Sequence, residues 1–153
     1  MRWLTWPTLD RYRDIGLLVL RAGLGAMFVW HGWPKLSGGP AKWEKLGGAM
    51  SALGIDFAPT FWGLCAALAE TVGGALLIVG LATRPAAAAL AFTMFVAWWN
   101  HYGDGEGFIE WSHSAEDGIA FVALILLGPG RYALDARLIG VGGRDAGERS
   151  LGS

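Results

Sequence analysis

Four long stretches of this chain are almost free of charge, and they limit what it can fold into. Residues 15–33 and 57–81 carry one formal charge each, and residues 85–102 carry none. A helix over 15–33 would be roughly 28 Å long, close to the thickness of a bilayer core. The fourth stretch, 118–130, reaches that length only when it is extended back to residue 112. We therefore predict an all-α, membrane-embedded four-helix bundle with spans at about 15–33, 57–81, 85–102 and 112–130.

The composition excludes several other classes of protein. Of the 153 residues, 54% are hydrophobic and only 16% are charged, which is too apolar for a disordered chain. A net charge of −1 supplies none of the basic surface that a nucleic acid needs, so nucleic acid is excluded as a partner. The single cysteine, Cys65, excludes an internal disulfide and a cysteine-based zinc or iron–sulfur site.

The basic residues between the predicted spans indicate an orientation. Arginine and lysine concentrate on the cytoplasmic side of membrane proteins. With Arg21 left aside, eight arginines fall on one side of a four-span arrangement and three lysines on the other. We therefore predict that both termini are cytoplasmic, with a short N-terminal segment at 1–14, a membrane domain at 15–138 and a flexible tail at 139–153.

A short amphipathic helix is predicted between the first two spans. It begins at Pro40, a residue that suits the first turn of a helix. Charged side chains at Lys42, Glu44 and Lys45 define its polar face. Its apolar side chains recur at helical spacing and are Trp43, Leu46, Met50 and Leu53. Such a segment is expected to lie on the outer membrane surface.

Two charged residues fall inside predicted spans. A charge in the bilayer core costs roughly 2.5–3.5 kcal/mol on insertion scales, so each needs a partner. Counted along ideal helices, Arg21 and Glu70 lie about 9 and 16 Å from the inner edge, a gap that an extended arginine can close. We predict a structural ion pair between Arg21 and Glu70, which would serve as a latch or as part of a functional site.

The three histidines of the chain, His31, His101 and His113, all fall at the predicted outer end. One interpretation is that the membrane interface simply tolerates polar residues there. The other is a pocket at the mouth of the bundle that exchanges protons with a ligand, because imidazole and carboxylate groups suit that task. Haem or a metal ion is a further alternative, but no ligand motif such as HExxH accompanies these histidines, and we predict no metal site.

Five motifs along the chain resemble those of a known family. They are Arg21-Ala-Gly-Leu-Gly, His31-Gly-Trp-Pro-Lys35-Leu, Glu70-Thr-Val-Gly73-Gly74, Gly80-Leu-Ala-Thr-Arg84-Pro and Gly128-Pro-Gly-Arg131-Tyr-Ala-Leu-Asp135. In order and spacing they resemble the DoxX family of small four-helix membrane proteins, over roughly residues 14–138.

The resemblance implies a bacterial or archaeal inner-membrane protein. Relatives in this family include the small subunit of thiosulfate:quinone oxidoreductase, and some members are associated with oxidative-stress complexes. The resemblance thus implies a possible partner redox subunit. The acidic residue that opens the fourth helix in relatives corresponds best to Glu116, with Glu110 as the alternative.

These observations lead to two hypotheses for function. The first is an integral membrane subunit of a redox system that interacts with quinone and a partner protein. The second is a non-enzymatic membrane scaffold or small-molecule carrier, and in either case a homo-oligomer is left open. For the first, the predicted catalytic residues are His31, Lys35, Glu70, His101 and Glu116. The predicted aromatic wall for a quinone ring consists of Trp30, Trp98 and Trp99.

Overall fold

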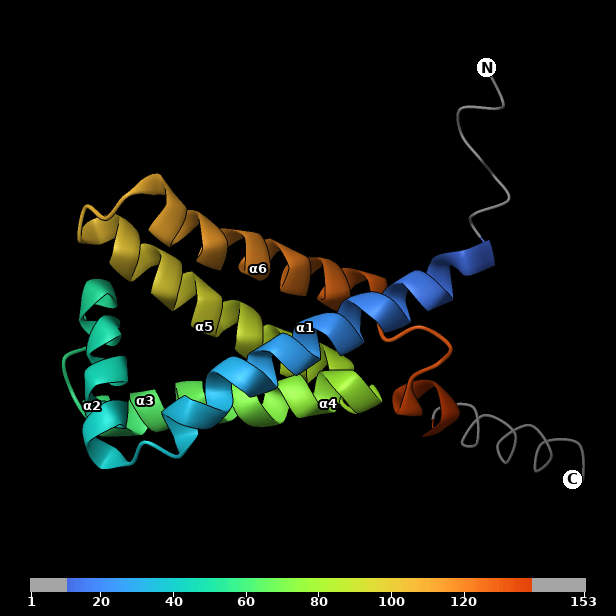
Figure 1. Cartoon of the computed structure of the whole chain (residues 1–153), viewed down its shortest axis with the longest axis horizontal. Coiled ribbons are helices and arrows are strands. Elements are labelled where there is room, and N and C mark those ends of the chain that lie inside the picture. Colours follow the sequence, from blue (N-terminus) through green and yellow to red (C-terminus); the bar gives the residue numbers. More distant parts are fainter. Residues whose placement is uncertain (1–10, 139–153) are drawn as a thin grey trace, which may run out of the picture.

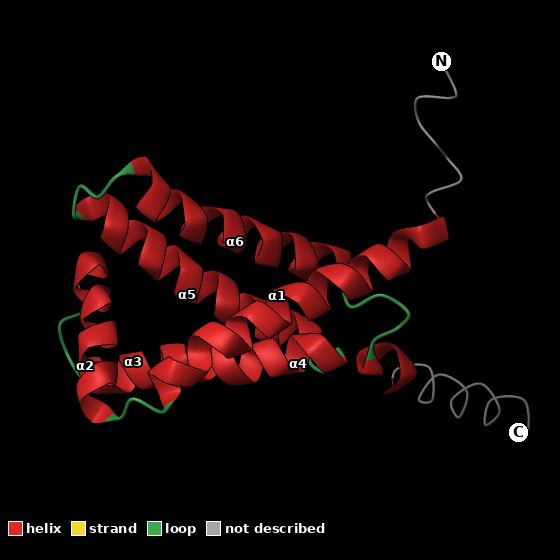
Figure 2. Ribbon diagram, viewed as in Figure 1, coloured by secondary structure: helices red, strands yellow, loops and turns green. Residues whose placement is uncertain are grey.

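The computed structural model describes residues 11–138, and within that range every regular element is helical. Figures 1 and 2 show α1 (Arg13–Leu36), α2 (Pro40–Gly47), α3 (Pro59–Leu68), α4 (Gly74–Val79), α5 (Thr83–Gly103) and α6 (Phe108–Leu127). A 3₁₀ segment, Gly48–Leu53, follows α2, and a π-helical segment, Ala69–Gly73, joins α3 to α4. The all-α prediction is confirmed for this part of the chain. The predicted tail at 139–153 and residues 1–10 of the predicted N-terminal segment lie outside the described residues.

Two of the helical stretches are long and apolar enough to cross a membrane. They are α1 and the continuous helix Pro59–Val79, which contains α3, the π-helical segment and α4. Helices α5 and α6 have 21 and 20 residues, a similar length. They are not among the stretches that meet this criterion of length and composition, and α6 carries the adjacent acids Glu116 and Asp117. The four-span arrangement therefore stays a prediction for α5 and α6.

The helices form a wedge that is closed at one end and open at the other. The hairpin of α5 and α6 and the pair α3–α4 diverge toward the end of the molecule where α2 lies (Figure 1). Helix α1 packs against α4 and the π-helical segment, and α5 packs against the same two elements. The rings of Phe28 on α1 and Phe121 on α6 meet edge to face, 4.8 Å apart, in the buried core.

Glycines set the position of α1 along α4. A Cβ atom placed on Gly25 would lie only 2.5 Å from the carbonyl oxygen of Gly74. A Cβ atom on Gly32 would lie 2.7 Å from the backbone nitrogen of Thr71 and 2.8 Å from Cβ of Glu70. The two backbones can approach this closely only because these positions carry no side chain. The register of α1 against α4 and the π-helical segment is therefore specified by Gly25 and Gly32.

The short helix predicted to begin at Pro40 is present as α2. It crosses the wide end of the wedge and continues into Gly48–Leu53. The indole N–H of Trp43 donates to the carbonyl oxygens of Lys35 and Leu36, at 3.1 and 3.2 Å. Farther along, the indole N–H of Trp99 on α5 donates to the carbonyl oxygen of Ala52 at 3.0 Å. These hydrogen bonds hold α2 and the 3₁₀ segment that follows it across the wide end of the wedge.

The narrow end is tied together by the chain that follows α6. The carboxylate of Asp135 accepts hydrogen bonds from the backbone N–H groups of Ala82 and Thr83, at 2.7 and 2.8 Å. Its own backbone N–H donates to the carbonyl oxygen of Gly80 at 2.9 Å. Asp135 thus caps the first turn of α5 from a distant part of the sequence.

Candidate functional site

The predicted ion pair between Arg21 and Glu70 is wrong. The buried guanidinium of Arg21 donates instead to the carbonyl oxygens of Leu77 and Ile78, at 2.8 and 2.9 Å, and to that of Tyr132 at 2.8 Å. The first two carbonyls belong to the last turn of α4, where helical carbonyls have no partner within the helix. The glycine-set register places Arg21 level with Ile78, eight residues or about 12 Å along the helix from Glu70.

Glu70 pairs with Lys35 instead. The ammonium of Lys35 lies 2.7 Å from Oε1 and 2.6 Å from Oε2 of Glu70. Both residues are among the predicted site residues, but the sequence analysis did not join them. Helix α1 runs through Pro34 without ending, so His31 and Lys35 lie on neighbouring turns of one helix face. The cation that pairs with the buried carboxylate of Glu70 therefore lies one helical turn along α1 from His31.

The backbone at Glu70 departs from a regular α-helix. Glu70 lies in the π-helical segment Ala69–Gly73, which interrupts the otherwise continuous helix Pro59–Val79. Single π-helical turns inside α-helices are frequent at functional sites. Gly32 also allows α1 to approach this segment closely, so the same local feature positions both partners of the ion pair.

A large cavity occupies the wide part of the wedge. Its volume is about 1110 Å³, at or above the upper end of the range for small-molecule sites. Its lining comes from α1, α2, α3, α5 and α6 as well as from the 3₁₀ and π-helical segments. The ion pair of Lys35 and Glu70 is part of this lining. The side chain of Lys35 is 31% exposed and that of Glu70 only 2% exposed, so the pair presents mainly its ammonium end to the cavity.

Several predicted site residues line this cavity. Trp30 and His31 contribute from α1, Lys35 and Glu70 form the ion pair, and His101 contributes from the last turn of α5. Nδ1 of His101 lies 2.6 Å from a carboxylate oxygen of Glu106, in the loop that leads to α6. The structure thus brings together residues that are far apart in the sequence.

Three predicted site residues do not line the cavity. Glu116 is exposed on another face of α6, and its neighbour Asp117 faces the cavity in its place. Because one residue along a helix turns the side chain by about 100°, adjacent acids point in different directions. Trp98 lines a separate apolar groove between α5 and α6, and the indole N–H of Trp99 is hydrogen-bonded to the carbonyl oxygen of Ala52. The side chain of Glu110, the alternative to Glu116, lies outside the described part.

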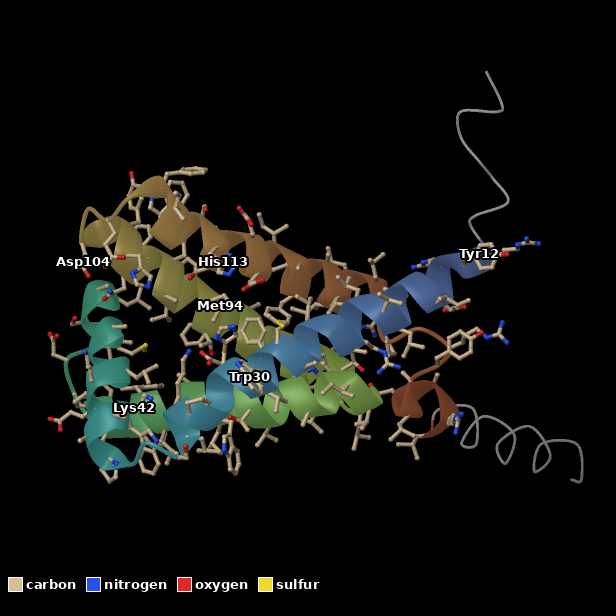
Figure 3. The ribbon with its side chains drawn as sticks, in the orientation of Figure 1. Tyr12, Trp30, Lys42, Met94, Asp104 and His113 are labelled. Carbon is tan, nitrogen blue, oxygen red and sulfur yellow. The ribbon has the colours of Figure 1, made fainter. Side chains whose placement is uncertain are left out.

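The sequence analysis did not include Asp117 among the site residues. It placed His113 at the outer end of the bundle but gave it no catalytic role. His113 and Asp117 are four residues apart on α6, a spacing that places two side chains on one helix face. This spacing could have identified them as a pair from the sequence. Both line the cavity together with His31 of α1. Figure 3 labels His113 on α6 and Trp30 on α1, the two helices that carry most of these polar groups. Among the described residues, no group of three or more His, Cys, Asp or Glu side chains is arranged to hold a metal ion.

Comparison with known proteins identifies the family. The DoxX family model matches residues 16–103, more than half of the chain. The chain belongs to the DoxX family. This match contains the motifs of Arg21, His31, Glu70 and Arg84, so the family assignment rests on the residues that build the wedge and the ion pair.

Relatives in two bacteria match along most of their length. The chain is 28% identical to the Escherichia coli protein named inner membrane protein YqjF, over 85% of this chain and 97% of that protein. It is 29% identical to inner membrane protein YphA of the same organism, over 83% of this chain and 97% of that protein. An uncharacterized Haemophilus influenzae protein is 32% identical, over 83% of this chain and 93% of its own length. No solved structure matches.

Proposed function

We propose that this DoxX-family protein is an inner-membrane subunit of a redox system, and that its cavity binds the head group of a quinone. The observation that carries the proposal is the Lys35–Glu70 pair in the cavity wall. An ionisable group within a membrane-spanning helix is costly and usually serves a substrate or proton path. The relatives named as inner membrane proteins support the location, and the positive-inside count supports cytoplasmic termini.

The lining offers the groups that a quinone head needs. A quinone has two carbonyl oxygens that accept hydrogen bonds, and it takes up two electrons and two protons when it becomes a quinol. Lys35 and the imidazoles of His31 and His101 are donors on the lining. The ring of Trp30 supplies a flat apolar surface. A partner redox protein would supply the electrons.

Proton supply is assigned to the acids and imidazoles of the same cavity. Imidazole is the side chain that most often passes protons in proteins, so His31 and His113 are assigned the path between the wide end and the ligand. Asp117 takes the place of Glu116, which the sequence analysis predicted as a catalytic residue, because Asp117 is the acid of this pair that lines the cavity. Glu70 receives or returns the proton of Lys35 as the ligand's oxygen changes charge.

Quinone binding by variants in lipid nanodiscs tests this function. Affinity for decylubiquinone is measured for wild type, Lys35→Met and Asp117→Asn, and Glu116→Gln is the control. The control residue is the adjacent acid on the same helix but lies outside the cavity lining. Loss of a charged hydrogen-bonding partner is worth about 1.5–3 kcal/mol, so Lys35→Met should bind quinone at least about tenfold more weakly. Asp117→Asn removes a proton carrier of the cavity and should make quinone affinity depend differently on pH from that of the wild type. Equal affinity in all four proteins would favour the scaffold or carrier hypothesis.

A further inference from the structure

The cavity has two chemically different parts. The polar part lies along α1, α6 and the π-helical segment and contains Lys35, Glu70, His31, His113 and Asp117. The other part lies between α5 and the stretch that runs from α3 into the start of the π-helical segment, and it is lined by small or apolar side chains. We call it the apolar slot, and it is formed by Ala66, Ala69, Ala89 and Phe92.

The apolar slot follows one face of each helix. Ala66 and Ala69 are three residues apart, as are Ala89 and Phe92, so each pair shares a helix face. The next polar residue of the α5 face is Thr93, and its hydroxyl donates to the carbonyl oxygen of Ala89 at 3.0 Å. That bond satisfies the hydroxyl within its own helix. The slot therefore offers an apolar surface without a free donor from Thr93.

The slot reaches the surface of the molecule. Phe92 is 51% exposed although it lines the cavity, and Ala89 is exposed as well. Alanines at the three other positions leave room between α3 and α5 that larger side chains would fill. In a membrane-spanning bundle this side of the molecule faces hydrocarbon chains, not water.

Both ends of the slot are closed by packing. Toward the wide end, the segment Gly48–Leu53 packs against α5, and the bond from Trp99 to Ala52 holds it there. Toward the narrow end, the last residue of the π-helical segment, Gly73, packs on Leu90 of α5, which is fully buried. The slot is therefore a bounded opening in the side of the wedge.

We propose that the apolar slot admits the hydrocarbon chain of a lipid-soluble ligand from the bilayer, while the polar part of the cavity holds the ligand's head group. An apolar chain leaves the lipid and enters an alanine-lined slot without losing hydrogen bonds, which a polar molecule could not do. The carbons of the chain then follow Ala89 and Phe92 out to the lipid. The identity of the head group rests on the proposed function, but the slot does not.

The native thiol provides a test that needs no quinone. Cys65 is the only cysteine of the chain, it lines the same cavity, and it immediately precedes Ala66 of the slot. Methyl and dodecyl methanethiosulfonate carry the same reactive group and differ only in chain length. Their rates of reaction with Cys65 in lipid nanodiscs, followed by intact-protein mass spectrometry, compare a small molecule with one that must place a chain in the slot.

Two adjacent alanines supply matched variants. Ala88 and Ala89 are both exposed on α5, but only Ala89 lines the cavity. Ala89→Phe should slow the dodecyl reagent about tenfold, the effect of roughly one unfavourable packing contact, and should leave the methyl rate within about twofold. Ala88→Phe should change neither rate. In the opposite direction, Phe92→Ala should accelerate the dodecyl reagent, whereas Phe95→Ala, which alters an exposed residue outside the cavity, should not.

Several results would overturn the proposal. In the wild-type protein, an unreactive Cys65 or a thiol that reacts with the methyl reagent alone would show that no chain reaches it. Equal effects of Ala88→Phe and Ala89→Phe, or equal slowing of both reagents, would show that the slot is not the route. If Ala89→Phe fails to fold, the comparison of Phe92→Ala with Phe95→Ala decides. A functioning slot in a protein that binds no quinone would refute the proposed head group and leave the slot in place.

Discussion

The ammonium group of Lys35 contacts both carboxylate oxygens of Glu70, and the two partners differ in exposure. The side chain of Lys35 is 31% exposed, whereas that of Glu70 is 2% exposed. An unpaired lysine at this site can still reach solvent or a polar surface, but an unpaired carboxylate cannot. The consequences of breaking the pair therefore depend on which partner is removed.

Removing the lysine should cost more stability than removing the acid. Lys35→Met leaves a buried carboxylate without its cation, which typically costs about 3–5 kcal/mol, and Glu70→Gln should cost less. The double variant that combines Lys35→Met with Glu70→Gln should be more stable than Lys35→Met alone. Thermal unfolding in detergent measures the stability of all three variants.

The losses of stability in Arg21→Met and Glu70→Gln should be additive when the two are combined, because these residues have no shared partner. A strong coupling between them would contradict the assignment.

The guanidinium of Arg21 should not be replaceable by an ammonium. It reaches three carbonyl oxygens, of Leu77, Ile78 and Tyr132, with two of its nitrogens. A lysine keeps the charge but lacks the planar fork, so Arg21→Lys should lower the unfolding free energy by about 1.5–3 kcal/mol. Arg13→Lys, at an exposed position on the same helix, should leave the melting temperature unchanged. Equal stability of the two variants would show that the carbonyl contacts contribute nothing.

Gly32 should tolerate no side chain. An alanine there would crowd Thr71 and Glu70 and push α1 away from the π-helical segment, at a cost of about 1–3 kcal/mol. Gly23→Ala is the control, since a Cβ on Gly23 meets nothing within 4 Å. Because Gly32→Ala displaces Glu70, it should weaken quinone binding as well as lower the melting temperature. A variant as stable as Gly23→Ala would show that the close approach is not required.

The cap formed by Asp135 should make stability depend on pH in the acidic range. Partial burial raises the pKa of Asp135, but hydrogen bonds from Thr83 and Ala82 and the charge of Arg21 outweigh it and hold the pKa below its ordinary value. A lowered folded-state pKa stabilises the protein above the unfolded value of about 3.9, and the stabilisation is lost as pH falls through the folded value. Asp135→Asn should cost about 1 kcal/mol at neutral pH and flatten the acid limb of the stability curve. An unchanged acid limb in this variant would remove Asp135 as its source.

The four-span arrangement can be tested directly with reporter fusions. Fusions placed after Ser51, Arg84, Gly107 and Ser153 should report outside, inside, outside and inside. The physical basis is the excess of arginine on the predicted cytoplasmic side. A fusion after Ser153 that is active only outside would remove the fourth span.

Much of the architecture could be predicted from local sequence patterns. The uncharged stretches predicted the long helices, and Pro40 with its amphipathic pattern predicted α2. The motifs that include His31 and Glu70 indicated the family. These inferences succeed because hydrophobic periodicity and helix-starting residues act within a few turns of the chain.

The choice of partners was decided only by the tertiary structure. The sequence shows that Arg21 and Glu70 each need a partner, but the contacts of Gly25 with Gly74 and of Gly32 with Thr71 determine how far α1 slides along its neighbour. A shift of α1 by two helical turns along its neighbour would therefore change which residues pair with Arg21 and Glu70.

The same applies to the acid of the cavity. Glu116 and Asp117 are adjacent and chemically alike, so no local pattern distinguishes them, and only the rotation of α6 against α5 determines which of them faces the cavity. Register and rotation are set by close packing between helices distant in sequence. The residues thus determine which groups must be paired, and packing determines the pairs.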